Sequence, residues 1–135
     1  MKIIVIDGQG GRMGSLFIER FCQTHKGEAE IIAIGTNSIA TAQMLKAGAD
    51  AGATGENPVI VQSPDADYIV GPIGIIATDS LLGEITEKMA SAVSRSKALK
   101  ILIPVNTCKY RVMGSENKTL SELINHAVDT IVSAN

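Results

Sequence analysis

The seven residues from Gly8 to Gly14 have the types and spacing needed to bind a phosphate group through the backbone. They read Gly8-Gln9-Gly10-Gly11-Arg12-Met13-Gly14, directly after an apolar run and before a stretch with helical spacing. A phosphate at the amino end of a helix needs accessible N–H groups, which glycines leave uncovered. Arg12 would add a positive charge. The segment therefore predicts nucleotide binding, with NAD(P) as the leading candidate cofactor.

The glycines at positions 8, 11 and 14 follow the pattern G-x-x-G-x-x-G, because position 13 is Met rather than Gly. We expect Gly8 to form the tight turn and Gly10 or Gly11 to let the backbone meet a pyrophosphate. Gly14 would let the helix pack closely against its strand. A Walker-type loop does not fit, since Gly14-Ser15 lacks the Gly-Lys-Ser/Thr ending. The alternative is a βα turn in which the glycines serve structure only.

Asp7 precedes this loop and places a carboxylate next to the expected phosphates. Two roles remain open for it. It could accept hydrogen bonds from loop N–H groups and hold the turn. It could instead contact a ribose or a metal-bridged phosphate.

Further candidate cofactor-binding residues follow other predicted strands, namely Thr36, Asn37 and Ser38, and Gly71, Pro72 and Ile73. NAD enzymes usually carry an acidic residue after the second strand, where it binds the ribose hydroxyls. Here Gly35-Thr36-Asn37-Ser38 has no carboxylate, and no Arg or Lys follows that would neutralise a 2′-phosphate. The three polar side chains could hydrogen-bond a ribose, or Asn37 or Ser38 could simply cap the second helix.

The segment from Gly71 to Gly83 is long for a connection in so small a chain, which is typical of functional loops. Its isoleucines at 73, 75 and 76 could line an apolar pocket, cover a nicotinamide or adenine ring, form a subunit contact or pack in the core.

Whether the chain catalyses a reaction is left undecided, and three residues are candidate catalytic groups: Asp79, Glu84 and Cys108. The two carboxylates flank an expected helix start, where such groups more often act as caps. Cys108 lies near Lys109 and Arg111, which could favour its thiolate. With two histidines and no E-x-x-H pattern, we expect no metal site.

The elements that must position these residues alternate between strands and helices. Strands are expected at 3–6, 31–34, 59–61, 67–70 and 100–103, and residues 48–57 are expected to be a loop. Helices are expected up to His25, from Ser38 to Ala47, after Thr86 and after Thr119. This predicts a three-layer, Rossmann-like α/β fold with a mainly parallel sheet in the order 3-2-1-4-5 and helices on both faces. Loops 8–14, 35–38, 71–84 and 104–110 would then meet at one sheet edge.

Composition limits the class of protein. The 135 residues, 45% hydrophobic, suit one domain over 1–135. A net charge of −2 argues against a nucleic-acid partner, and the lack of an 18-residue apolar run argues against a membrane span. Two cysteines without a CxxC pair indicate a reducing, cytoplasmic setting. A homodimer is the default expectation.

The loop from Gly8 to Gly14 resembles the nucleotide loop of dihydrodipicolinate reductases, which use NADH or NADPH. The likeness covers roughly the first 25 residues and implies loop roles for Gly8, Gly11, Arg12 and Gly14. That family's His-His-x-x-Lys segment is absent, so its activity is not implied. The whole chain is similar to a small uncharacterised bacterial family, a domain of unknown function, which implies no activity. The segments that carry this likeness are 5–11, 35–41, 45–57, 71–76 and 103–106.

Three functions are consistent with this pattern. The first is a nucleotide-binding protein, acting as a sensor or regulator, with its phosphate at the 8–14 loop. The second is a structural or oligomeric interaction module without a nucleotide. The third is a small enzyme acting on a phosphorylated metabolite.

Overall fold

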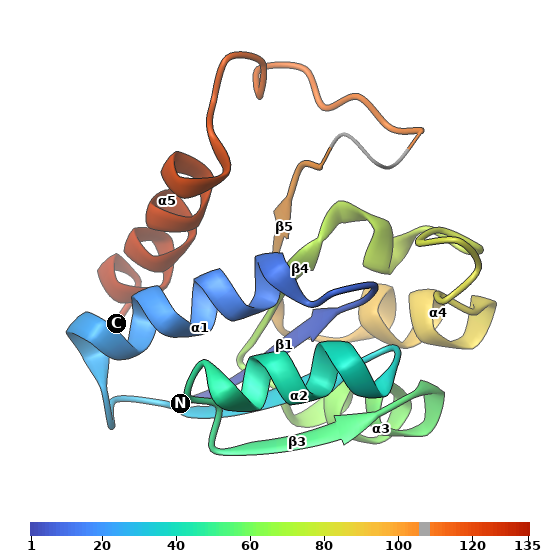
Figure 1. Ribbon diagram of the computed structural model, residues 1–135, viewed down its shortest axis with the longest axis horizontal. Helices are drawn as coiled ribbons and strands as arrows, with labels where there is room; N and C mark the ends of the chain where they lie inside the picture. The colour runs from blue at the N-terminus through green and yellow to red at the C-terminus, as the bar shows by residue number, and fades with distance from the viewer. Residues whose placement is uncertain (106–108) are drawn as a thin grey trace.

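The computed structural model describes residues 1–105 and 109–135, which form a five-stranded parallel sheet with helices on both faces (Figure 1). The strands are β1 (Lys2–Asp7), β2 (Glu30–Gly35), β3 (Ala51–Thr54), β4 (Tyr68–Pro72) and β5 (Leu99–Ile103). The α-helices are α1 (Arg12–His25), α2 (Ser38–Lys46), α3 (Glu56–Gln62), α4 (Glu87–Arg95) and α5 (Leu120–Ser133). Two short 3₁₀ turns are η1 (Ser63–Asp65) and η2 (Ile73–Ile76).

The strand order is β3-β2-β1-β4-β5, which confirms the expected Rossmann-like α/β topology. β1 is central and pairs with β2 on one side and β4 on the other. Asp7, the last residue of β1, is in register with Gly35, the last residue of β2. The loops that follow β1, β2 and β4 therefore leave the sheet side by side at its carboxyl edge.

Alternate residues of the strands feed two separate cores, as the period of two in a strand requires. On one face, Ile3 and Val5 pack with α1 and α5, where Phe17 and Ile131 are fully buried. On the other face, Ile4 and Ile6 pack under α3 and α4. Continuous apolar runs such as Ile3-Ile4-Val5-Ile6 are thus buried on both sides.

The prediction for residues 48–61 was wrong in two places. The expected loop contains β3, and the expected strand at 59–61 lies inside α3. β3 reads Ala-Gly-Ala-Thr and carries no apolar run because it is a largely exposed edge strand. A β-carbon on Gly52 would lie 2.8 Å from Leu45 Cγ, so a side chain would collide with α2 there. Pro58 lies in the first turn of α3, where a missing N–H is tolerated.

The predicted helix starts are largely confirmed by their caps. The side-chain oxygens of Asn37, Thr86 and Thr119 accept hydrogen bonds from backbone N–H groups of α2, α4 and α5. Ser38, expected as a cap of α2, is instead its first residue. Among the described residues, no helix is both long and apolar enough to cross a bilayer.

Candidate functional site

The candidate site lies at the carboxyl edge of the sheet, above the point where the chain order reverses between β1 and β4. In open α/β sheets ligands bind in the crevice at such a switch point, because the loops from the two central strands diverge there. Here the turn after β1, residues 8–11, and residues 73–86 after β4 follow the two strands at this point.

Asp7 accepts hydrogen bonds from N–H groups of the loop, which is the first of the two roles considered for it. Its side chain is 5% exposed, and its oxygens accept hydrogen bonds from Gly8 N at 2.8 Å and Gly14 N at 2.7 Å. Burial raises the pKa of Asp7, aided by the charge of Glu84 and opposed by the bonds from Gly14, Gly8 and Met13. Asp7 therefore occupies amides at the start of α1 that a phosphate would otherwise use.

The glycines of the loop divide into structural and open positions. Gly11 has a φ of 70°, and a β-carbon there would lie 2.8 Å from Ala40 Cα. At Gly14 a β-carbon would lie 3.0 Å from Asp7 Cβ, which fits the expected close packing of helix on strand. Gly10 is exposed, and a β-carbon there would meet nothing within 4 Å. Only Gly10 of these three leaves room for a ligand.

Gly8 is the first residue of the tight turn after β1, where its carbonyl accepts a hydrogen bond from Gly11 N at 2.9 Å. The left-handed residue next to it is Gln9, with a φ of 49°. A β-carbon on Gly8 would lie 2.6 Å from Thr36 Oγ1 and 2.9 Å from Leu81 Cδ1. Gly8 is needed because two other loops approach its backbone closely.

Glu84, from the segment after β4, contacts the loops after β1 and β2 and is held by three donors. Its carboxylate accepts hydrogen bonds from Gln9 N at 3.1 Å, Asn37 Nδ2 at 2.7 Å and the Thr36 hydroxyl. Burial alone would raise the pKa of Glu84, but the hydrogen bonds from Thr36, Asn37 and Gln9 outweigh it and lower the pKa. The carboxylate is therefore ionised at neutral pH.

The segment from Ala77 to Thr86 that carries Glu84 contacts the start of the glycine loop, at Gly8 and Gln9. Leu81 lies over Gly8, and the backbone of Asp79, Leu81 and Leu82 is left-handed, a conformation that side chains disfavour. Leu82 is 93% exposed, whereas Ile85 is fully buried. The segment is thus a tight, exposed turn anchored at its end by Ile85.

A carboxylate does stand beside the end of β2, although the sequence there has none. It comes from Glu84, 47 residues beyond Asn37. No local spacing signals this placement, so sequence reasoning missed it. The signal that could have found it is topological: β2 and β4 both neighbour β1, so their loops can meet above the β1 turn.

The other predicted site residues are dispersed. Thr36 and Asn37 reach the site, and Asn37 also caps α2 through Ala40 N, while Ser38 is exposed. Gly71 and Pro72 are buried within β4, and Ile73 opens η2. Arg12 is exposed at the start of α1, and Met13 is buried in the core. The Asp79 side chain is exposed, and Cys108 lies outside the described residues.

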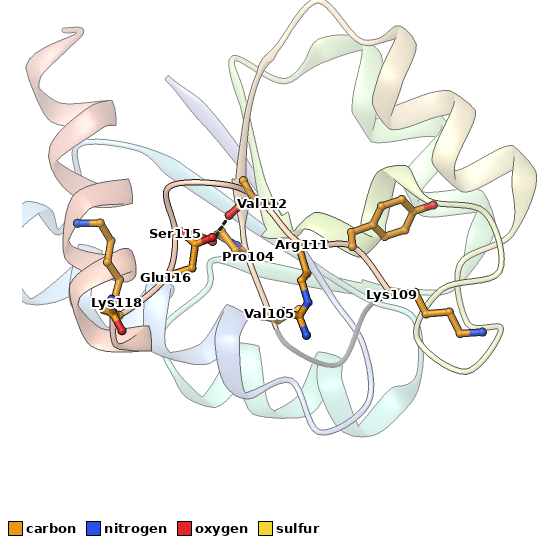
Figure 2. A pocket seen from close by; sticks show the side chains of 10 residues that line it. Pro104, Val105, Lys109, Arg111, Val112, Ser115, Glu116 and Lys118 are labelled. Atoms are coloured by element: carbon orange, nitrogen blue, oxygen red, sulfur yellow. Dashed lines mark hydrogen bonds between the residues drawn. The ribbon is translucent and has the colours of Figure 1, made fainter.

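A separate cavity of about 600 Å³ lies at the same sheet edge, in the connection between β5 and α5. Lys109, Arg111 and Lys118 line it, with Pro104 and Val105 at the end of β5. Figure 2 shows the three basic side chains pointing in different directions rather than toward one point. The cavity therefore offers positive charge without a converged anion site. Among residues 1–105 and 109–135, no group of three His, Cys, Asp or Glu side chains could hold a metal ion.

The fold and these converging loops define the class: a Rossmann-like α/β protein with its candidate site at the carboxyl edge of a parallel sheet. Within that class, the chain belongs to the family described as Domain of unknown function (DUF3842), which matches residues 2–135. No curated protein matches the sequence.

One similar solved structure is the crystal structure of a dodecameric FMN-dependent Ubix-like decarboxylase from Escherichia coli O157:H7. It is 15% identical, covers 99% of this chain and 94% of its own, and has a TM-score of 0.55. At this identity the similarity shows the fold alone.

Proposed function

We propose that the protein binds a nucleotide-type small molecule at the carboxyl edge of the sheet, where the loops after β1, β2 and β4 meet. The observation that carries the proposal is the convergence of Gln9 N, Thr36 Oγ1 and Asn37 Nδ2 on one anionic group beside the open backbone of Gly10. These donors come from the loops after β1 and β2, next to the switch point, and together they suit the charged oxygens of a phosphorylated ligand.

The contact with the phosphate differs from that of a usual dinucleotide loop. Because Gly14 N donates to Asp7, the first turn of α1 is already capped by the protein's own carboxylate. We therefore place the ligand's phosphate over Gln9 and Gly10, with Arg12 supplying positive charge at the rim, rather than on the axis of α1.

The ligand candidates are NAD, NADP and FMN. NAD(P) follows from the glycine loop, and FMN is added because the structural neighbour is named as FMN-dependent. Binding is the whole of the proposed activity, in a sensory or regulatory role, since Asp7 is committed to the fold and Asp79 is exposed on a turn. A homodimer stays a prediction; the structurally similar decarboxylase is named as dodecameric.

Calorimetry with NAD, NADP, FMN, ATP and CoA tests the proposal, with Gly10→Leu as the decisive variant. A leucine at this position projects into open space, so we expect the fold to persist and ligand binding to weaken at least about tenfold. Gly11→Val is unsuitable, because the backbone of Ala40 would clash and the protein itself would be destabilised.

The matched control is Gln23→Leu, which adds a leucine at an exposed position near the other end of α1. It should bind like the unaltered protein. No heat with any of the five ligands, or equal binding by Gly10→Leu, would refute the proposal and favour an interaction module.

A further inference from the structure

We infer that Glu84 occupies an anion seat of the site, formed by Gln9 N, Thr36 Oγ1 and Asn37 Nδ2, and that a phosphate group of the ligand binds there by displacing the Glu84 carboxylate. The inference deepens the proposed function, on which it rests for the location of the site. It assigns the site a phosphate subsite, and it identifies the Glu84 carboxylate as the protein's own group that competes for this subsite.

The seat consists of donors alone. Asn37 Oδ1 accepts the bond from Ala40 N that caps α2, so the amide nitrogen of Asn37 must face Glu84. Gln9 contributes a main-chain N–H, and the Thr36 hydroxyl donates to the same carboxylate. A group with several acceptor oxygens and a negative charge, such as a phosphate, satisfies these donors together.

The donors are held in place without help from Glu84. Asn37 is fixed by its cap on α2 and by a second bond from Nδ2 to Gln9 O at 2.9 Å. The backbone of Thr36 is fixed by the bond from its N–H to Asp7 O at 2.9 Å. Removing the Glu84 side chain should therefore leave an empty seat rather than a collapsed one.

Glu84 lies on residues 78–84, a turn whose side chains are exposed or half-buried. The turn is anchored on either side by the buried side chains of Ile75 and Ile85, and Leu81 packs against the core under α3 and α4. For the seat to open, only the carboxylate of Glu84 has to leave it, and Leu81 can stay in its place.

The competing interpretation is that Glu84 itself binds ribose hydroxyls, as an acidic residue after the second strand does in NAD enzymes. A carboxylate has about four acceptor positions, and Glu84 already uses three, for Thr36, Asn37 and Gln9. One position remains, whereas a ribose diol needs two. The two interpretations predict opposite effects when Glu84 is removed.

The experiment compares Glu84→Ala with Asp79→Asn, at an exposed carboxylate on the same turn, so that both variants change the net charge equally. Asparagine suits the left-handed backbone of Asp79, so the turn should be kept. Inorganic phosphate and pyrophosphate are titrated by calorimetry and by NMR at the Gln9 amide. We expect Glu84→Ala to bind them roughly tenfold tighter or more than Asp79→Asn, since a competing anion and its repulsion are removed. Thr36→Val in the Glu84→Ala background should reverse part of this gain by removing one donor.

Equal phosphate affinity in Glu84→Ala and Asp79→Asn overturns the inference, as does a loss of nucleotide binding in Glu84→Ala. The two proposals fail separately. If the unaltered protein binds a nucleotide but Glu84→Ala gains no phosphate affinity, only the anion seat is refuted. If no nucleotide binds but Glu84→Ala gains phosphate affinity, only the proposed function is refuted.

Discussion

The carboxylate of Glu84 lies 2.7 Å from the side-chain nitrogen of Asn37, across the turn that follows β1. The contact joins the loop after β4 to the loop after β2, two segments that the sheet order places on opposite sides of β1. It places a charged group of the protein's own at the switch point. The electrostatics of the site therefore depend on two carboxylates, Asp7 and Glu84, whose pKa values shift in opposite directions.

These opposite shifts predict opposite pH dependences of stability. The pKa of Asp7 is raised above 3.8, so the folded state holds that proton more tightly than the unfolded state does. The stability that Asp7 contributes should therefore be greatest at low pH and fall as pH rises from 3.8 through the folded-state value. The pKa of Glu84 is lowered from 4.5, so its contribution is present above 4.5 and is lost as pH falls through the folded-state value.

Urea unfolding of the unaltered protein, Asp7→Asn and Glu84→Gln across about pH 3 to 6 measures both effects. As pH rises, the free energy of unfolding of the unaltered protein minus that of Asp7→Asn should fall. The same difference taken against Glu84→Gln should rise. If both differences changed in the same direction with pH, the pKa shifts assigned to Asp7 and Glu84 would be contradicted.

Two adjacent glycines should respond very differently to the same substitution. Gly11→Ala places a methyl group 2.8 Å from Ala40 Cα and 2.9 Å from Ala40 O, on a backbone with a φ of 70°. We expect it to lower the free energy of unfolding by at least about 1–3 kcal/mol. Gly10→Ala meets no atom within 4 Å and serves as the control, with an expected change within about 0.5 kcal/mol. Thermal unfolding of both variants checks this. Similar losses of stability in Gly11→Ala and Gly10→Ala would show that the contact with Ala40 does not require a glycine at position 11.

The topology could be predicted from the sequence because the buried strands are apolar runs and the helices have spaced apolar positions. β1 and α5 are clear examples, since each buries the residues that the pattern selects. β3 could not be recognised in this way: its four residues pair through the backbone, and its environment excludes a large side chain at Gly52. α3 was misread because Val59-Ile60-Val61 after Pro58 fits a strand and a short helix equally well.

The candidate site shows the same division between local and long-range information. The glycine turn and the cap at Asn37 are local, so their positions followed from spacing. Whether Asp7 faced the loop or a ligand depended on the backbone path around it. Glu84 entered the site through tertiary structure alone, and its expected roles as cap or base did not include a contact with Gln9, Thr36 and Asn37.

Thr41 should stabilise the end of the edge strand β3 through its hydroxyl. Thr41 is 7% exposed, and its Oγ1 lies 2.7 Å from Thr54 Oγ1 and 3.2 Å from Ala53 O. Thr41→Val keeps the shape but loses these bonds, so the free energy of unfolding should fall by about 1 kcal/mol. Hydrogen exchange at Gly55 N, which donates to Gly35 O, should accelerate because β3 ends beside it.

The control for this variant is Thr24→Val, which removes an exposed hydroxyl from the surface of α1. It should change stability by less than about 0.5 kcal/mol and leave the Gly55 amide unaffected. Unchanged exchange at Gly55 in Thr41→Val would mean that the hydroxyl does not hold β3.

The coupling between Asn37 and Glu84 can be measured with a double-mutant cycle. Asn37→Asp preserves an acceptor that can cap α2, but it replaces the donor facing Glu84 with a second carboxylate. We expect a loss of about 1–3 kcal/mol in the free energy of unfolding, partly recovered at high salt because the repulsion is screened. In the Glu84→Gln background the same substitution should cost less, with a coupling of at least about 0.5 kcal/mol. Asn57→Asp, an equal charge change at an exposed position in the first turn of α3, should have little effect in either background. Additive losses in the cycle would show that Asn37 and Glu84 do not interact in solution and that the Glu84 carboxylate does not occupy the anion seat.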